Sequence, residues 1–96
     1  EMTVVPGGLE AESRQMLDNI RNTLVAHGLT MDDVVKCTIM LADMSEWTAF
    51  NAIYATYFTP PYPARSAMGV NGLAIGARVE AECVAVEGAA RAKGRG

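Results

Sequence analysis

Apolar and polar positions recur with two different periods along the chain, and these periods predict its elements. From residue 9 to residue 27 the apolar side chains fall largely on one helical face, with most charged side chains away from it. Gly28 follows directly, and a glycine in this position commonly ends a helix in the left-handed conformation. The pattern therefore predicts a first helix over 9–27.

A strand is predicted next, because apolar side chains alternate with polar ones over 34–42. The apolar face consists of Val35, Cys37, Ile39 and Leu41. Residues 30–33, Thr-Met-Asp-Asp, resemble a short capped turn that leads into this strand. Met40 and Ala42 make the second face partly apolar, so we expect that face to be partly buried against a partner subunit.

Most of the aromatic residues fall in one further segment at helical spacing. Asp43, with Glu46 three residues later, offers a helix start. Pro60 and Pro61 end the helix, since neither donates a backbone hydrogen bond and each restricts the residue before it. The sequence predicts a second helix over about 45–58, whose aromatic side chains we expect in the core rather than in a cofactor site.

Two more strands are expected, over 65–71 and 78–87, and residues 72–76 between them suit a hairpin or a crossover. In the last strand alternation places Glu80 and Glu82 on one face, opposite a face of small and apolar side chains. The order helix, strand, helix, strand, strand indicates an α+β fold, with a mixed sheet and both helices packed on one face. Three strands make a thin sheet, which is expected to need further strands or a partner.

Size and composition fit a single domain that spans 1–96, since half of the 96 residues are hydrophobic. The small, basic tail at 88–96 is expected to be flexible. Lys and Arg number 8 against 11 Asp and Glu, so no basic field is present to bind nucleic acid. No apolar run approaches the roughly 20 residues of a membrane span, and no signal segment is evident, so we expect a cytoplasmic protein that does not bind membranes.

The cysteines and the histidine argue against several classes of site. Cys37 and Cys83 lie in apolar runs at a spacing that matches neither a metal knuckle nor a redox Cys-x-x-Cys, and we expect two buried free thiols. His27 is the sole histidine and closes a helix, where a cation complements the dipole. A His-dependent triad or His-ligated metal site is thereby excluded within one chain. The serines lie in no nucleophile elbow, and the glycines form no phosphate-binding loop.

Arg65 is the first candidate for chemistry, because it follows a rigid Tyr-Pro-Ala loop at the start of a predicted strand. A guanidinium fixed there can bind a carboxylate through two parallel hydrogen bonds, a geometry that lysine cannot reproduce. The alternative is an ordinary ion pair at the surface.

Two acids and an amide complete the candidate residues. Glu80 and Glu82 share a strand face with valines, where one carboxylate can orient or deprotonate a water molecule. The alternative is that one or both pair with Arg65, Arg78 or a neighbouring subunit's cation. Asn51 on the second helix either donates to a substrate or caps the carbonyl of a neighbouring loop.

The element Pro63-Ala64-Arg65-Ser66 lies after an Asn-x-x-Tyr pair and before two alternating glutamates, which is a specific combination. Together with further segments, this combination resembles one known family, the Rid (YjgF-like) proteins. The similar segments extend over about 9–86 and comprise 14–20, 33–41, 50–54, 57–58, 63–66 and 79–82.

The resemblance implies a chorismate-mutase-like fold, with two helices on one face of a sheet and three copies closing into a homotrimer with sites between subunits. Deaminases of this family hydrolyse reactive 2-imino and enamine acids to 2-keto acids and ammonia, without a metal or organic cofactor. By this resemblance Arg65 binds the substrate carboxylate, Glu80 positions the attacking water, and Asn51 lies near the cleft. Ala67 stands where many members have a cysteine, so only its backbone is available to the substrate.

Three functions remain open at this point. The first is the imine deaminase, and the second is a regulatory member that binds a small carboxylate without converting it. The third is an RNA-cleaving protein, a function attached to some relatives, which the acidic charge balance and the solitary His27 disfavour. Family members also begin with further residues that form two strands and supply a tyrosine and a Ser-Gly segment to the cleft, and we expect these strands to be absent from 1–96.

Overall fold

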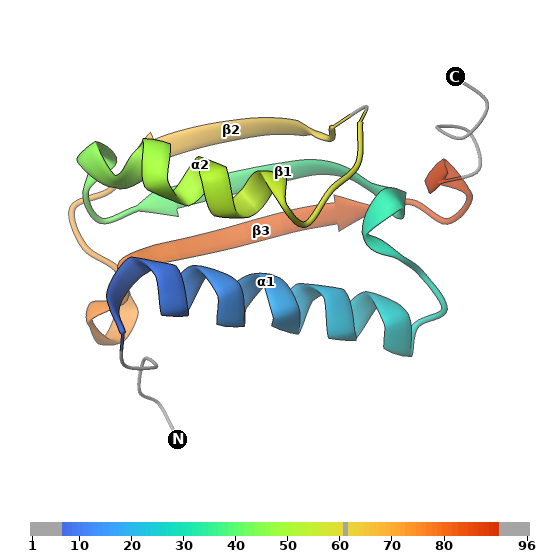
Figure 1. The fold of residues 1–96 in the computed structure, drawn as a ribbon, viewed down its shortest axis with the longest axis horizontal. Helices are drawn as coiled ribbons and strands as arrows, with labels where there is room; N and C mark the ends of the chain where they lie inside the picture. The colour runs from blue at the N-terminus through green and yellow to red at the C-terminus, as the bar shows by residue number, and fades with distance from the viewer. Residues whose placement is uncertain (1–6, 61, 91–96) are drawn as a thin grey trace.

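A computed structural model describes residues 7–60 and 62–90 of the chain. These residues form two α-helices and three β-strands, interspersed with three short 3₁₀ turns (Figure 1). In chain order the elements are α1 (Gly8–Ala26), η1 (Met31–Asp33), β1 (Val34–Leu41), η2 (Met44–Glu46), α2 (Trp47–Ala55), β2 (Ala64–Gly69), η3 (Ala74–Gly76) and β3 (Val79–Ala85). This order is the predicted one.

The sheet is mixed, with strand order β2-β1-β3. The central strand β1 runs parallel to β2, where Cys37 lies beside Arg65, and antiparallel to β3, where Cys37 lies opposite Cys83. Because β2 and β3 flank β1 on opposite sides, the segment between them crosses the end of β1. Of the two expected connections, the crossover is therefore the one formed.

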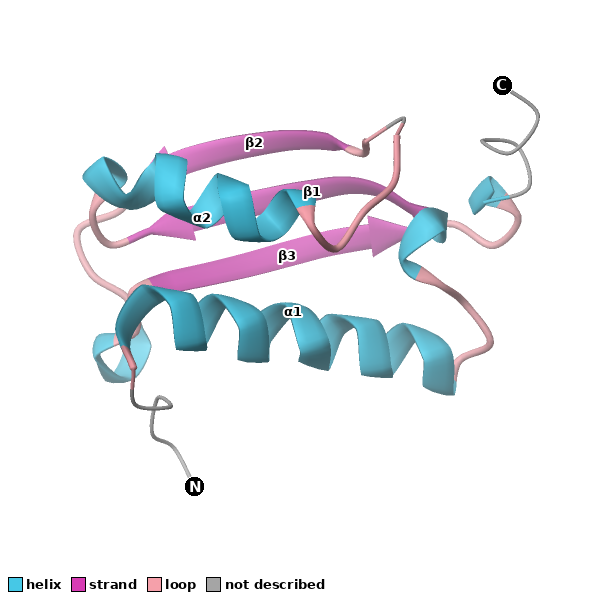
Figure 2. Ribbon diagram, viewed as in Figure 1, coloured by secondary structure: helices cyan, strands magenta, loops and turns pink. Residues whose placement is uncertain are grey.

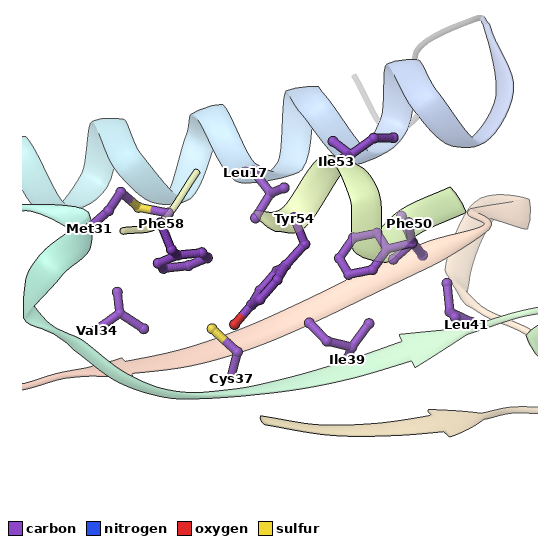
Figure 3. Close-up of a cluster of buried hydrophobic side chains, with 11 residues drawn as sticks. Leu17, Met31, Val34, Cys37, Ile39, Leu41, Phe50, Ile53, Tyr54 and Phe58 are labelled. Carbon is purple, nitrogen blue, oxygen red and sulfur yellow. The ribbon is translucent and has the colours of Figure 1, made fainter. Parts of the chain in front are cut away.

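Both helices cover the same face of the sheet, and the core fills the space between the two layers (Figures 2 and 3). The predicted α+β architecture is confirmed. The core draws on both helices, the strands β1 and β3 and the loops that join them, through Leu17, Met31, Val34, Cys37, Ile39, Leu41, Phe50, Ile53, Tyr54, Phe58 and Val79. On the other face Met40 is half-buried and Ala42 is exposed. Of the two residues that suggested a partly buried second face, Met40 is thus partly buried within the described part of the chain and Ala42 is not.

The ends of the two helices show which sequence signals determine where a helix begins or stops. Gly28 has φ 78°, and the N–H groups of Gly28 and Leu29 donate to the carbonyls of Val25 and Leu24, so the predicted glycine stop is confirmed. The Asp43 side chain accepts a hydrogen bond from the Ser45 N–H, as expected for a helix start. The second helix nevertheless ends at Ala55, earlier than predicted.

The early end of α2 has a local cause. The Thr56 hydroxyl donates to the Ile53 carbonyl, and the Tyr57 N–H donates to the Tyr54 carbonyl, which tightens the last turn. Phe58 leaves the helix but returns to the core, where it is buried. Its place in the apolar pattern therefore reflects burial in the core, although its backbone is not helical.

The prediction of two free thiols is wrong, because Cys37 and Cys83 form a disulfide. Their Cα atoms lie 4.1 Å apart on directly opposed positions of β1 and β3. Both side chains point to the helix-covered face, which brings the sulfur atoms together. The separation of 46 residues along the chain gave no sign of this proximity, which depends on strand register.

Part of the predicted tail is held by the fold. Within the tail, the Ala90 N–H donates to the Asp33 carboxylate at 2.9 Å, and just before it the Val86 N–H donates to the Asp33 carbonyl. The rest of that tail, 91–96, lies outside the described residues, as do 1–6. Within the described part of the chain, no helix is long and apolar enough to cross a membrane.

Candidate active site around Arg65

The side chain of Arg65 is fixed by three residues of α2. Its guanidinium carbon lies 5.0 Å from the centre of the Trp47 ring and 5.3 Å from that of the Tyr54 ring, within the range of cation–π attraction. Its Nη1 donates a hydrogen bond to Oδ1 of Asn51. Arg65, the second residue of β2, is therefore oriented by two rings and an amide.

These three partners share one face of α2 because of their spacing. Trp47, Asn51 and Tyr54 are separated by four and three residues, which places them on one helical stripe. Tyr54 is 1% exposed and is anchored in the core against Phe50. The stripe therefore gives the guanidinium a rigid backing.

No carboxylate neutralises Arg65 within 7–60 and 62–90. The ion pairs of these residues join Arg14 to Glu10, Arg21 to Asp18 and Arg78 to Glu46. The surface ion pair considered from the sequence is thus not formed here. Four of the five guanidinium N–H groups remain available beyond the bond to Asn51.

A pocket of about 300 Å³ opens beside this guanidinium. Asn51, Tyr54 and Ala55 of α2 form one wall, and Tyr62, Pro63 and Arg65 form the other. Burial raises the pKa of the Tyr54 hydroxyl, while the charge of Arg65 lowers it in part. Arg65 is therefore the charged group of the pocket, which suits a small anion.

Ala67 lies two residues beyond Arg65 on β2 and points to the same face, beside Ile39. It is exposed and carries no polar side-chain atom. Any contribution from this position to a ligand would come from its backbone.

Within one chain, Glu80 does not lie at this pocket. It lies opposite Met40 on the antiparallel strand β3, on the face turned away from the helices. It is exposed, and neither Glu80 nor Glu82 makes an ion pair or side-chain hydrogen bond to the described residues. Arg78 instead bonds Glu46 through Nε and Nη2, with a shortest distance of 2.6 Å, which raises the pKa of Arg78.

The contacts of Trp47 and Tyr54 with Arg65 were missed from the sequence, where the aromatic residues of the second helix were assigned to the core. That assignment holds for Phe50 and Phe58, but Trp47 and Tyr54 also contact the guanidinium. The available signal was their shared stripe with Asn51. It could not be used without knowing that β2 lies beside α2.

His27 has the structural role expected of it. Its Nδ1 lies 2.8 Å from the Thr23 carbonyl oxygen, so this nitrogen carries the proton and donates at the end of α1. Among the described residues, no three His, Cys, Asp or Glu side chains gather in a group that could hold a metal. Neither the histidine nor the acids therefore mark a metal centre in this part of the chain.

Comparison with known proteins shows extensive similarity. The family described as Endoribonuclease L-PSP matches residues 1–87. The chain is 46% identical to the mouse 2-iminobutanoate/2-iminopropanoate deaminase and 41% identical to the human protein of that name, in each case over 85 residues. This alignment covers 88% of the chain but 63% and 62% of those relatives. The chain thus spans less than two thirds of their length.

Solved structures agree with this similarity. The yeast protein YEO7_yeast superposes with a TM-score of 0.82 at 40% identity, covering 86% of this chain and 66% of that one. The yjgF gene product of E. coli superposes with a TM-score of 0.81 at 36% identity, covering 86% and 68%. The described fold is therefore shared with proteins of clearly related sequence.

Proposed function

Since the chain belongs to the Rid (YjgF-like) family, described as Endoribonuclease L-PSP, we propose that it is a hydrolytic deaminase of small 2-imino acids. The products would be a 2-keto acid and ammonia, and the site would lie between the subunits of a homotrimer. The names of the mouse and human relatives support the reaction class.

The observation that carries this proposal is the unpaired, oriented guanidinium of Arg65. The guanidinium group lies against Trp47 and Tyr54 and is held by Asn51. It therefore loses little conformational freedom when it binds a carboxylate. The adjoining pocket of about 300 Å³ is of a size for a small organic acid. We therefore assign Arg65 as the carboxylate anchor.

The carbon of the C=N bond must then meet a water molecule. In the proposed step the Glu80 carboxylate takes a proton from this water as its oxygen bonds to the carbon, and the proton passes to nitrogen. The hydroxyl group of the adduct then gives up its proton, which also passes to nitrogen, so the C–N bond breaks, ammonia leaves and the C=O group of the 2-keto acid forms. Holding the water and the electrophile together removes much of the entropic cost of this step.

Glu80 would come from a neighbouring chain, because within one chain it lies on the sheet face opposite to Arg65. Self-association would bring Glu80 of one chain close to Arg65 of another. It is possible on geometric grounds because β2 is at one edge of the described sheet and the face that carries Glu80 is open. Asn51 would keep Arg65 in place, and Ala67 would offer its backbone to the ligand.

RNA cleavage, which the family description also names, has less support. The chain carries a formal net charge of -3, whereas RNA binding draws most of its affinity from basic groups on phosphates. The sole histidine is committed to the Thr23 carbonyl at a helix end. We therefore favour the deaminase.

The test is release of 2-keto acid from imines generated in situ by an amino-acid oxidase, with semicarbazide to trap unhydrolysed imine. Wild-type protein should reduce the semicarbazone yield, and Arg65→Ala should not. If folded wild-type protein has no effect on imine loss, the deaminase is excluded and ligand binding without turnover, the regulatory alternative, takes its place.

A further inference from the structure

The two sulfur atoms of the Cys37–Cys83 disulfide have different surroundings. Cys37 is 0% exposed and belongs to the core beneath α2 (Figure 3). Cys83 is partly exposed and lines a pocket of about 270 Å³ between α1 and β3. Only one of the two sulfurs can therefore be reached from this pocket.

The pocket has an apolar floor and a polar rim. Its lining residues come from the second half of α1 and from the strands beneath it, namely Asn19, Ile20, Thr23, Leu24, Val34, Cys83 and Ala85. None of them carries a charge. The Asn19 Oδ1 accepts from Gln15 Nε2, which leaves the Asn19 amide N–H groups free to donate to a ligand.

This pocket is separate from the Arg65 site. It lies at β3, whereas Arg65 lies on β2, and the central strand β1 runs between them. The two pockets share no lining residue. Chemistry at Cys83 can therefore be measured independently of the proposed deaminase.

We propose that Cys83 is a thiol–disulfide exchange site for small, uncharged aliphatic thiols. The thiolate of such a molecule attacks Sγ of Cys83, a new S–S bond forms, and the Cys83–Cys37 bond breaks. The electron pair leaves with Sγ of Cys37, which takes up a proton and becomes a buried thiol. Electrons and atoms balance without an added oxidant.

The accessibility of the two sulfur atoms determines which of them the incoming thiolate attacks. Attack on a disulfide depends on which sulfur the thiolate can approach, as well as on the acidity of both thiols. Cys37 is enclosed by core side chains, so approach to its sulfur requires the core to open. Approach to Cys83 requires only entry between Ile20 and Leu24 of α1 and the strand.

The probe for this exchange is 2-mercaptoethanol, added to the native full chain and quenched with acid. Intact mass followed by peptide mapping should find one 2-mercaptoethanol adduct on Cys83 and a free thiol on Cys37. An adduct on Cys37, equal adducts on both cysteines, exchange that needs denaturant, or two free thiols in the untreated protein would each overturn the proposal.

A matched pair of variants tests the pocket itself. Thr23→Trp, at an exposed position of the rim, should fill the pocket and slow adduct formation several-fold. Thr48→Trp makes the same change at an exposed position of α2 and should leave the rate unchanged. Equal rates in both variants, with unfolding midpoints like that of the wild type, would show that the thiol does not enter through this pocket.

Discussion

Arg65 and Glu80 point to opposite faces of the same sheet. Arg65 lies beside Cys37 on the helix-covered face, and Glu80 lies opposite Met40 on the open face. The strand β1 separates their two strands. A substrate held by Arg65 therefore meets Glu80 only if a second chain supplies it.

Arg65→Lys should lower kcat/KM by roughly 100-fold, because an ammonium cannot form the two parallel bonds of a guanidinium fork. The measurement is steady-state keto-acid release at equal protein concentration. Arg14→Lys provides the control, since Arg14 is exposed on α1 and pairs with Glu10. Turnover like the wild type in Arg65→Lys would remove Arg65 from the site.

Trp47→Leu should raise KM more than it lowers kcat, since the indole positions Arg65 and does not touch the reacting atoms. Loss of one cation–π contact, worth about 1 kcal/mol, corresponds to a roughly fivefold weaker affinity. Trp47→Phe keeps an aromatic face and should recover most of the affinity. If the leucine and phenylalanine variants have the same KM, the ring does not orient the guanidinium.

Glu80→Gln should lower kcat by about 100-fold or more, because the amide cannot accept the proton of the attacking water. Binding of a 2-keto acid, measured by calorimetry, should persist. Glu82→Gln changes another exposed glutamate of β3 on the same face and should retain activity. Full activity in Glu80→Gln would show that another group handles the water.

Tyr54→Phe should stabilise the fold by about 1 kcal/mol at neutral pH, because the Tyr54 hydroxyl is buried without a hydrogen-bond partner. Burial also raises its pKa above the ordinary value of 10.0. Stability linked to this group is therefore complete below pH 10 and falls as pH rises through the folded pKa.

Denaturant unfolding from pH 7 to pH 11.5 measures both effects. Wild-type stability should fall above pH 10, and the fall should be smaller in Tyr54→Phe. A residual fall is expected from Tyr57, whose pKa is raised by burial and by its hydrogen bond to Asp18. A stability loss in Tyr54→Phe at pH 7 would mean that the hydroxyl has a partner in solution.

Local signals in the sequence predicted most of the fold. Gly28 and Asp43 acted through their own backbone geometry and hydrogen bonds, so the helix stop and the helix start were readable from neighbouring residues. The alternation along β3 correctly separated Glu80 from the core side of that strand. Each of these inferences needs only residues that are close along the chain.

Relationships across the sheet were not predictable in the same way. The disulfide depends on the register of β1 against β3, and the Arg65 cluster depends on the placement of β2 beside α2. The sequence identified Arg65 and Asn51 as candidates, but the backing by Trp47 and the opposite faces of Arg65 and Glu80 required the structure. Such inferences require the order and register of strands that lie far apart along the chain, and local sequence patterns do not contain this information.

The proposed deaminase site takes Arg65 from one subunit and Glu80 from its neighbour. Arg65→Ala and Glu80→Gln proteins, each inactive alone, are unfolded together in equal amounts with reductant, refolded, and assayed for keto-acid release. In a symmetric trimer, random mixing gives an intact pair at about one quarter of the sites, so activity near that fraction of the wild type is predicted. If mixed trimers form but stay inactive, the two residues do not meet across an interface.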